Sequence, residues 1–393
     1  MTPSRTRRIM FIILGIAVLG VLLYVAYRAL QPSAPAPDDG GQTIVGGSLP
    51  SPAIPQAPAG GGSDGTTPLP DLPSIAEERL VRLTDFPVIS PALNKDDTRV
   101  LFYKKSGGDL FSTDFTGKTQ EKQTNLTIIG LIEAIWQRGA GRGVVRYADA
   151  DIVKAFLQIG TSTIAILPQG ITSVAWSPDG GTLAYTFIRD DRLELVITDA
   201  TGKNPRSLLR TPLTDASVAW ITSDLFVFAT APSGTAEGYF FVFSRRDNSF
   251  VKIFGPQRGL MGLWSPDGAT AVISGIPAGK KETELALYNR AKKESLPLQL
   301  ATLPEKCVWA DAGSLFCAVP KIIPPGMMLP DAYLTGSFNS SDRIVRIDAA
   351  TRAISPVFDE GDFDMTNILV TKDKKRLFFV SRRDGMLWAL KLE

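Results

Sequence analysis

A repeated sequence unit constrains the fold of this chain more than any other feature. Residues 173–185 read Ser-Val-Ala-Trp-Ser-Pro-Asp-Gly-Gly-Thr-Leu-Ala-Tyr, and residues 261–273 match them in register. Residues 88–103 form a weaker copy. Aligning the other units gives seven anchor positions, which are Leu93, Trp136, Trp176, Trp220, Trp264, Trp309 and Val370. Successive anchors are 40 to 45 residues apart, except for a last interval of 61. A period of this length is typical of β-propellers.

Each unit contains apolar runs that predict four short strands. In the third unit they cover residues 174–176, 183–187, 193–198 and 206–209. The Ser-Pro-Asp-Gly sequence between the first two runs predicts a turn, because proline presets φ, aspartate bonds its own backbone and glycine accepts a positive φ. Only residues 127–134 are ambiguous, since their apolar run fits a strand or a helix.

The last unit is short and lacks a fourth strand. Residues 79–84, just before the first anchor, resemble the outermost strands of the other units. We therefore predict that they complete the final blade, which removes an exposed sheet edge. The predicted fold is all-β: a seven-bladed β-propeller over residues 75–393, closed by its N-terminal strand.

The repeat also resembles a known family. The Trp-Ser-Pro-Asp-Gly turn, an apolar strand and a strand ending near Asp-x-Thr-Gly-Lys are similar to the propeller repeats of TolB-like proteins. The resemblance covers most of residues 79–393, and two copies carry the full motif. WD repeats are a more distant match, because the chain has neither their Gly-His pair nor their Trp-Asp ending. The resemblance implies a closed ring and a protein-binding role, without naming a partner.

The N-terminal region predicts a membrane anchor. Residues 9–27 form an uncharged apolar run, long enough to cross a bilayer as a helix. The arginines of residues 1–8 place that end in the cytoplasm, so the rest faces outward. We predict a single-pass signal anchor over residues 9–30 in the cell (inner) membrane, with a periplasmic or extracellular propeller. A cleaved signal peptide is the alternative, but its apolar region is normally shorter.

Residues 31–74 predict a flexible linker between the anchor and the propeller. This segment of 44 residues contains 10 prolines and 8 glycines and shows no hydrophobic periodicity. Such a composition cannot bury enough apolar surface to fold alone. It is expected to act as a tether that holds the propeller away from the bilayer.

Composition excludes several classes of site. The chain has no histidine and two cysteines, so it cannot form a Ser-His-Asp site or a histidine-ligated metal centre. We find no recognisable catalytic motif and predict a non-enzyme without a metal or cofactor. The net charge is only +2, and the Lys and Arg residues form no basic stripe, which argues against nucleic-acid binding. The oligomeric state is not indicated by the sequence.

Two cysteines flank the predicted hairpin of the sixth unit. If Trp309 pairs with Leu315, Cys307 and Cys317 lie directly opposite each other, close enough for a disulfide. An outward-facing compartment permits oxidation. The alternative is a pair of small buried apolar side chains. The five repeated tryptophans are expected to pack the blades together rather than form a binding cage; they are Trp136, Trp176, Trp220, Trp264 and Trp309.

Three long loops mark one face of the predicted ring. The connections between the second and third strands grow over residues 230–238, 275–283 and 320–342, all on the same face of adjacent units. The longest is rich in proline, methionine and apolar residues, which suits an adaptable interface. We predict that it binds a protein partner; it could instead cap the ring or be disordered. The candidate contact residues are Ile322, Ile323, Met327, Met328, Leu329, Tyr333 and Phe338.

The sequence therefore predicts a membrane-tethered, extracytoplasmic propeller that acts as a non-catalytic protein-binding or scaffolding module. The alternative is an extracytoplasmic enzyme, or a propeller that binds a small molecule such as a sugar or cell-wall fragment in its central mouth. Propellers host both kinds of function, so the fold alone does not decide between them.

Overall fold

The fold was obtained as a computed structural model that describes residues 79–139, 141–161 and 163–392. The predicted anchor over residues 9–30 and the linker over residues 31–74 lie outside these ranges. Within the described ranges, no helix has both the length and the apolar character needed to span a bilayer.

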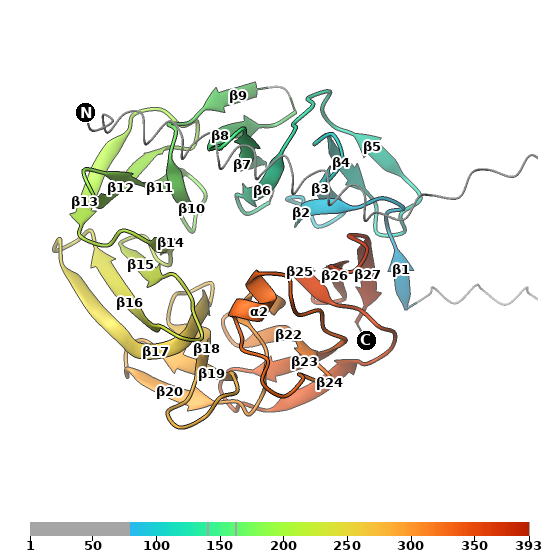
Figure 1. The fold of residues 1–393 in the computed structure, drawn as a ribbon. Coiled ribbons are helices and arrows are strands. Elements are labelled where there is room, and N and C mark those ends of the chain that lie inside the picture. Colours follow the sequence, from blue (N-terminus) through green and yellow to red (C-terminus); the bar gives the residue numbers. More distant parts are fainter. Residues whose placement is uncertain (1–78, 140, 162, 393) are drawn as a thin grey trace, which may run out of the picture. The chain divides into compact units, whose positions relative to one another are not determined.

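The described chain is built from antiparallel strands that form six sheets around a ring (Figure 1). Five sheets contain four strands, and one contains seven. The first three groups of four strands follow the chain in order. They comprise β2 (Val88–Leu93), β3 (Val100–Lys104), β4 (Leu110–Thr113) and β5 (Gln120–Lys122); β6 (Leu131–Trp136), β7 (Arg142–Asp149), β8 (Ile152–Ile159) and β9 (Thr163–Ile166); and β10 (Ile171–Trp176), β11 (Thr182–Arg189), β12 (Arg192–Asp199) and β13 (Arg206–Thr211).

The seven-stranded sheet follows, and one long strand runs through its middle. Its members are β14 (Ala216–Trp220), β15 (Leu225–Thr230), β16 (Glu237–Ser244), β17 (Phe250–Trp264), β18 (Thr270–Ile276), β19 (Glu284–Asn289) and β20 (Glu294–Pro297). The first part of β17 pairs with β16, and its last part pairs with β18.

The last two sheets hold the C-terminal part of the chain. One contains β21 (Cys307–Trp309), β22 (Ser314–Pro320), β23 (Asp342–Asp348) and β24 (Ile354–Phe358). The other contains β25 (Met365–Val370), β26 (Arg376–Ser381), β27 (Leu387–Lys391) and β1 (Leu80–Arg82). Two short helices lie between strands, η1 (Pro304–Lys306) and α2 (Asp331–Leu334).

The seven anchors predicted from the sequence occupy equivalent places. Each is the last residue of its strand, namely β2, β6, β10, β14, β17, β21 or β25. The four strands predicted for the third unit are confirmed as β10 to β13. The ambiguous residues 127–134 include no helix and lead into β6.

Three tryptophan anchors fasten their strand to the preceding group of strands. The indole Nε1 of Trp136 donates to Ser90 O at 2.7 Å, that of Trp176 to Ile135 O at 3.0 Å, and that of Trp309 to Leu263 O at 3.0 Å.

The other two tryptophans pack through their rings. Trp220 lies 4.4 Å from Phe226 between ring centroids, and its buried indole nitrogen has no hydrogen-bond partner among the described residues. Trp264 contacts Tyr288 and Phe240. These contacts agree with the predicted role of the tryptophans in packing the sheets together.

The Ser-Pro-Asp-Gly turn is held by its own side chains. Ser177 Oγ donates to Asp179 Oδ1 at 2.6 Å, and the same carboxylate oxygen accepts the Gly181 amide at 2.9 Å. Gly180 has a φ of +71°, a backbone conformation that residues with a side chain rarely adopt. The hydrogen bonds lower the pKa of Asp179 below its ordinary value, led by the bond from Ser177. Asp179 therefore acts as a turn former, as the sequence predicts.

The ring closes where the predicted N-terminal strand pairs with the C-terminal one. Leu80, Val81 and Arg82 of β1 lie opposite Leu390, Ala389 and Trp388 of β27. A hydrophobic cluster spans the same junction and includes Val100 and Phe102 from the first group and Phe378 and Leu387 from the last. The predicted closure by residues 79–84 is confirmed.

We predict that Trp309→Phe destabilises the ring more than Trp220→Phe does. Both side chains are buried to a similar extent, but only Trp309 donates a hydrogen bond from its indole nitrogen. Loss of this hydrogen bond should cost about 1 kcal/mol beyond the lost packing. Urea unfolding of both variants measures the difference. Equal destabilisation would show that the indole hydrogen bond does not hold the sheets together.

Candidate functional site: the capped face of the ring

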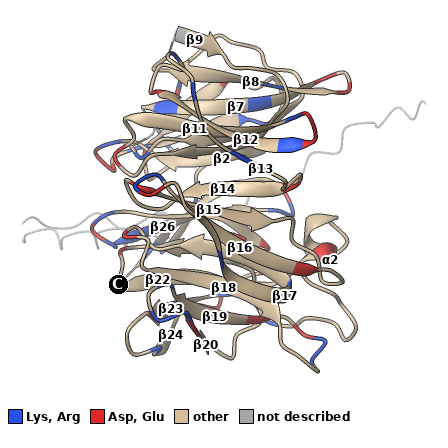
Figure 2. Ribbon diagram, turned by 90° about the vertical axis from the view of Figure 1, so that its left-hand side faces the viewer, with Lys and Arg blue, Asp and Glu red and all other residues tan. Residues whose placement is uncertain are grey.

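The longest connection between the described strands folds over one face of the ring. We call residues 321–341, between β22 and β23, the cap segment, and the face that carries it the cap face. The segment contains α2, the only α-helix among the described residues. Figure 2 shows α2 at one margin of the ring and the C-terminus at the other, so the two lie on opposite faces.

Part of the apolar surface of the cap segment is buried against the ring. Leu329, Tyr333 and Phe338 form a hydrophobic cluster with Met261 and Leu303, and Ile323 and Met327 pack against it while partly exposed. These five of the seven predicted contact residues therefore hold the segment onto the ring.

Three apolar side chains of the cap segment remain exposed. Ile322 is 78% exposed, Leu334 is 47% exposed and Met328 is 39% exposed. Ile322 and Met328 are among the predicted contact residues. Leu334 was not predicted, because nothing in the sequence shows which side of a four-residue helix faces solvent.

Polar contacts tie the cap segment to the two preceding loops. Asp331 Oδ2 accepts the Gly234 amide at 2.5 Å, and Ser233 Oγ donates to Asp331 Oδ1 at 3.3 Å. Thr283 Oγ1 donates to Leu329 O at 3.0 Å. The three lengthened loops thus meet on one face, as their positions in the repeat predict.

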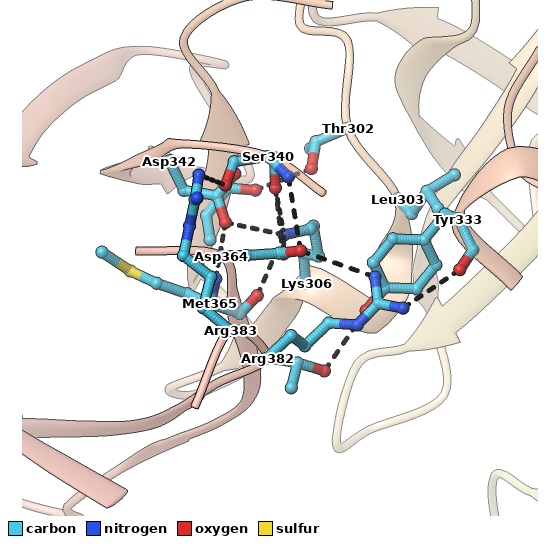
Figure 3. Close-up of polar contacts among 12 residues, drawn as sticks. Thr302, Leu303, Lys306, Tyr333, Ser340, Asp342, Asp364, Met365, Arg382 and Arg383 are labelled. Atoms are coloured by element: carbon cyan, nitrogen blue, oxygen red, sulfur yellow. Dashed lines mark hydrogen bonds and ion pairs between the residues drawn. The ribbon is translucent and has the colours of Figure 1, made fainter. Parts of the chain in front are cut away.

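A buried lysine with two aspartates lies below the cap segment (Figure 3). Lys306 Nζ is 2.6 Å from Asp342 Oδ2 and 2.7 Å from Asp364 Oδ1. It also donates to Ser340 Oγ at 3.0 Å and to Met365 O at 3.1 Å. The lysine is 1% exposed and both aspartates are fully buried. Burial raises the pKa of Asp342, against the opposing effect of Lys306.

Two arginines connect this cluster to the cap segment. Arg382 lies 4.0 Å over the ring of Tyr333 and donates to Tyr333 O at 3.2 Å. Its Nη1 is 3.7 Å from Asp364 Oδ2. Arg383 donates to Ser340 O at 2.9 Å. Burial raises the pKa of the Tyr333 hydroxyl to about 12, so this ring is neutral at physiological pH.

A second perturbed carboxyl, Glu305, stands next to Lys306 in η1. The residue is exposed to solvent, yet the surrounding protein raises the pKa of its carboxyl by desolvation. Arg382 opposes this shift, and Glu133 of β6 adds to it. Glu305 lies in η1, Arg382 directly after β26 and Glu133 in β6, so this electrostatic interaction joins three separate parts of the ring. Perturbed carboxyls in such a position are candidates for ligand contact.

The two cysteines lie where the predicted register places them. Cys307 is opposite Cys317 and Trp309 is opposite Leu315, as predicted. The structure joins Cys307 and Cys317 by a disulfide, with an S–S distance of 2.08 Å. Both cysteines are buried in a hydrophobic cluster between neighbouring sheets, so the disulfide is not exposed at the surface.

Another exposed apolar surface lies on the second group of strands. A groove of about 770 Å³ runs along it, lined by Ile129, Tyr147, Ile164 and Ile166 among others. Ile166, on the outer strand β9, is 88% exposed. The lining includes residues 148–150 of the β7–β8 connection, which lies on the same face of the ring as the cap segment, and the Asp149–Lys154 ion pair.

The sequence reasoning missed the Lys306 cluster. Asp342 and Asp364 are 36 and 58 residues away from Lys306 along the chain, so no local sequence pattern indicates the pairing. Among the described residues, no group of three potential ligands of the His, Cys, Asp or Glu type is placed to hold a metal ion.

No protein-family model and no curated protein matches this sequence. Solved structures do share the fold. An oligogalacturonate lyase in complex with manganese is 12% identical, with a TM-score of 0.59 over 80% of this chain and 93% of its own. The β-propeller domain of the Trilobed protease from Pyrococcus furiosus is 12% identical, with a TM-score of 0.54 over 78% of this chain and 93% of its own.

TolB from Acinetobacter baumannii is also similar, at 12% identity and a TM-score of 0.45 over 77% of this chain and 63% of its own, a likeness too low to carry an argument. Identities this low show the fold alone. They establish a β-propeller. They do not single out the TolB-like family that the repeat resembles.

We predict that Gly234→Ala loosens the cap segment. An added Cβ would lie 2.5 Å from Met328 Cγ and 2.7 Å from Asp331 Oδ2, so these side chains must shift, which disturbs the hydrogen bond from Gly234 to Asp331. Hydrogen exchange of the α2 amides should become faster. Gly141→Ala is the control, because a Cβ there meets no atom within 4 Å. Unchanged exchange in Gly234→Ala would show that this contact does not hold the cap segment.

Proposed function

We propose that this chain is a membrane-tethered, extracytoplasmic β-propeller that binds a protein partner through its cap face. The tethering rests on the apolar run at residues 9–27, the preceding arginines and the proline-rich segment after it. The cap face is the part of the ring that departs most from the repeated unit, and loops on a repeated scaffold commonly carry function.

One observation carries the binding proposal. Ile322, Met328 and Leu334 are exposed on a segment whose underside is fixed by buried packing and by hydrogen bonds to two other loops. An apolar surface held in one conformation binds without the entropic cost of ordering a loop. A partner with an apolar patch would therefore find a preformed surface here.

We also infer that the ring has seven blades. Dividing the seven-stranded sheet within β17, between its pairing with β16 and its pairing with β18, gives seven groups of four strands. Seven hydrophobic clusters each join two consecutive groups, including the last group and the first. This count agrees with the seven anchors of the sequence.

A second candidate function is the binding or conversion of a small molecule at the ring mouth. The observation that favours it is Glu305, a carboxyl with a raised pKa close to Arg382 and Glu133. The oligogalacturonate lyase fold shows that such a ring can carry an enzyme, but it assigns no substrate to this chain. Isothermal titration with galacturonate oligomers, compared with Glu305→Gln, tests it.

The protein-binding proposal is tested by photo-crosslinking in intact cells. A photoreactive residue in place of Ile322 should form an adduct with a partner, whereas the same residue in place of Val251 should not. Both positions are exposed and apolar, but Val251 follows the β16–β17 turn on the face opposite the cap segment.

A matched pair of substitutions gives the control. Leu334→Lys should reduce the adduct formed at position 322 severalfold, because it places a charge in the proposed contact. Ile354→Lys should leave it unchanged, since Ile354 is also exposed, at 39%, but follows the β23–β24 turn on the opposite face. Adducts that form only at position 251, or that survive Leu334→Lys at full yield, would refute the cap face as the binding surface.

A further inference from the structure

The cluster around Lys306 brings an amine and two carboxyl groups together in the interior of the protein. Lys306 Nζ lies 2.6 Å from Asp342 Oδ2 and 2.7 Å from Asp364 Oδ1, and all three side chains are buried (Figure 3). Solvent cannot stabilise these charges. The site therefore depends on its few internal partners for all of its electrostatic compensation.

The two oxygens of Asp342 are treated differently by the fold. Oδ2 accepts the Lys306 ammonium and also the Met365 amide, at 2.7 Å. Oδ1 is buried and has no hydrogen-bond partner among the described residues. An unpaired carboxylate oxygen in a buried site is costly, so a reaction that removes it lowers the energy of the folded state.

The second carboxyl is held as a fixed acceptor. Asp364 Oδ1 accepts from Lys306 and from Ser340 Oγ, the latter at 3.0 Å. Its Oδ2 accepts the Ser340 amide at 3.3 Å and lies 3.7 Å from Arg382 Nη1. Arg382 thus balances the charge of Asp364, which leaves Lys306 and Asp342 as the remaining pair of opposite charges.

We propose that Lys306 and Asp342 are joined by an intramolecular isopeptide bond, with Asp364 as the group that carries protons during its formation. The reaction condenses one ammonium and one carboxylate into a neutral amide and releases one water molecule. No oxidant, cofactor or second substrate is needed. A buried ion pair is thereby replaced by an amide, which removes the cost of burying two charges.

The hydrogen bond from Lys306 to Asp364 starts the proposed reaction. Asp364 takes one proton from Lys306 Nζ and, when its carboxyl turns toward Asp342, passes that proton to Asp342 Oδ1. The neutral amine then attacks Cγ of Asp342, and the electron pair of the C–Oδ2 double bond moves onto Oδ2, where the Met365 amide stabilises it. Asp364 transfers the second proton from Nζ to Oδ1. The Cγ–Oδ1 bond breaks, water leaves, and the carbonyl at Oδ2 forms again.

Burial supports the first of these steps. It raises the pKa of Asp342, which favours the protonated carboxyl that the amine attacks. The product keeps two groups paired, since the new carbonyl still accepts the Met365 amide and Asp364 still faces Arg382. Oδ1, the atom without a partner, is the one that departs.

The bond would lock the cap segment at its base. It links η1 to the first residue of β23, directly after the cap segment, and closes a loop of 36 residues that contains the Cys307–Cys317 disulfide. The two crosslinks together would fasten the sixth group of strands, which supports the cap face. The inference goes beyond the proposed binding function and does not depend on it.

Peptide mapping of the full chain, purified from membranes and then reduced, alkylated and digested with trypsin, tests the proposal. An isopeptide bond blocks cleavage after Lys306, so residues 294–321 should appear as one peptide, branched to residues 322–343. The branched species should be lighter than the sum of the two peptides by the mass of one water molecule. Separate peptides 294–306, 307–321 and 322–343 from the wild-type chain would overturn the proposal.

Two variants test the roles of the residues. Lys306→Arg keeps the positive charge but cannot form this bond, and should give only unlinked peptides. Asp364→Asn keeps the size of the side chain but cannot carry a proton, and should leave most of the protein unlinked. Thermal unfolding checks that Asp364→Asn is folded. If folded Asp364→Asn is linked as completely as the wild type, Asp364 is not the proton carrier and the mechanism is wrong.

Discussion

The structure depends on the need of each four-stranded group to bury its faces against its neighbours. A sheet of this size has no core of its own, and the hydrophobic clusters lie between consecutive groups. The first and last groups satisfy the same requirement only by meeting each other, through β1 on β27 and through Phe102 beside Phe378. Closure therefore follows from the repeat itself, and it fixes the positions of all the loops on both faces.

That constraint explains why the cap face can be elaborated. Once the ring is closed, a long connection between β22 and β23 cannot disturb the strand pairing, which continues on either side of it. The cap segment then uses the ring as a platform. Leu329, Tyr333 and Phe338 fill the space beneath it, and Asp331 and Thr283 fix it to adjacent loops. Lys306 and its aspartates secure its base from within.

The sequence predicted the fold better than the site, for physical reasons. Turn chemistry and tryptophan spacing are local, so Ser177-Pro-Asp-Gly and the anchors located the strands, and the Cys307–Cys317 register followed from one hairpin. Burial within the cap segment depends on contacts with distant loops. Apolar content therefore marked Leu329 and Tyr333 as contact residues although they face inward, and it missed Leu334. The pairing of Lys306 with Asp364 depends on the closed ring and leaves no local pattern.

The proposed function requires that the cap face of a propeller held outside the cytoplasm binds a partner. The most direct test is cross-linking in cells with a lysine-reactive reagent that cannot cross the cytoplasmic membrane, followed by mapping of the linked lysines. Lys280, Lys281 and Lys321 lie in exposed loops of the cap face, whereas Lys118, Lys203 and Lys292 lie in exposed turns of the opposite face. Binding at the cap face predicts partner cross-links through the first three lysines. Cross-links confined to the other three, or lysines that react only after the cells are lysed, would contradict it.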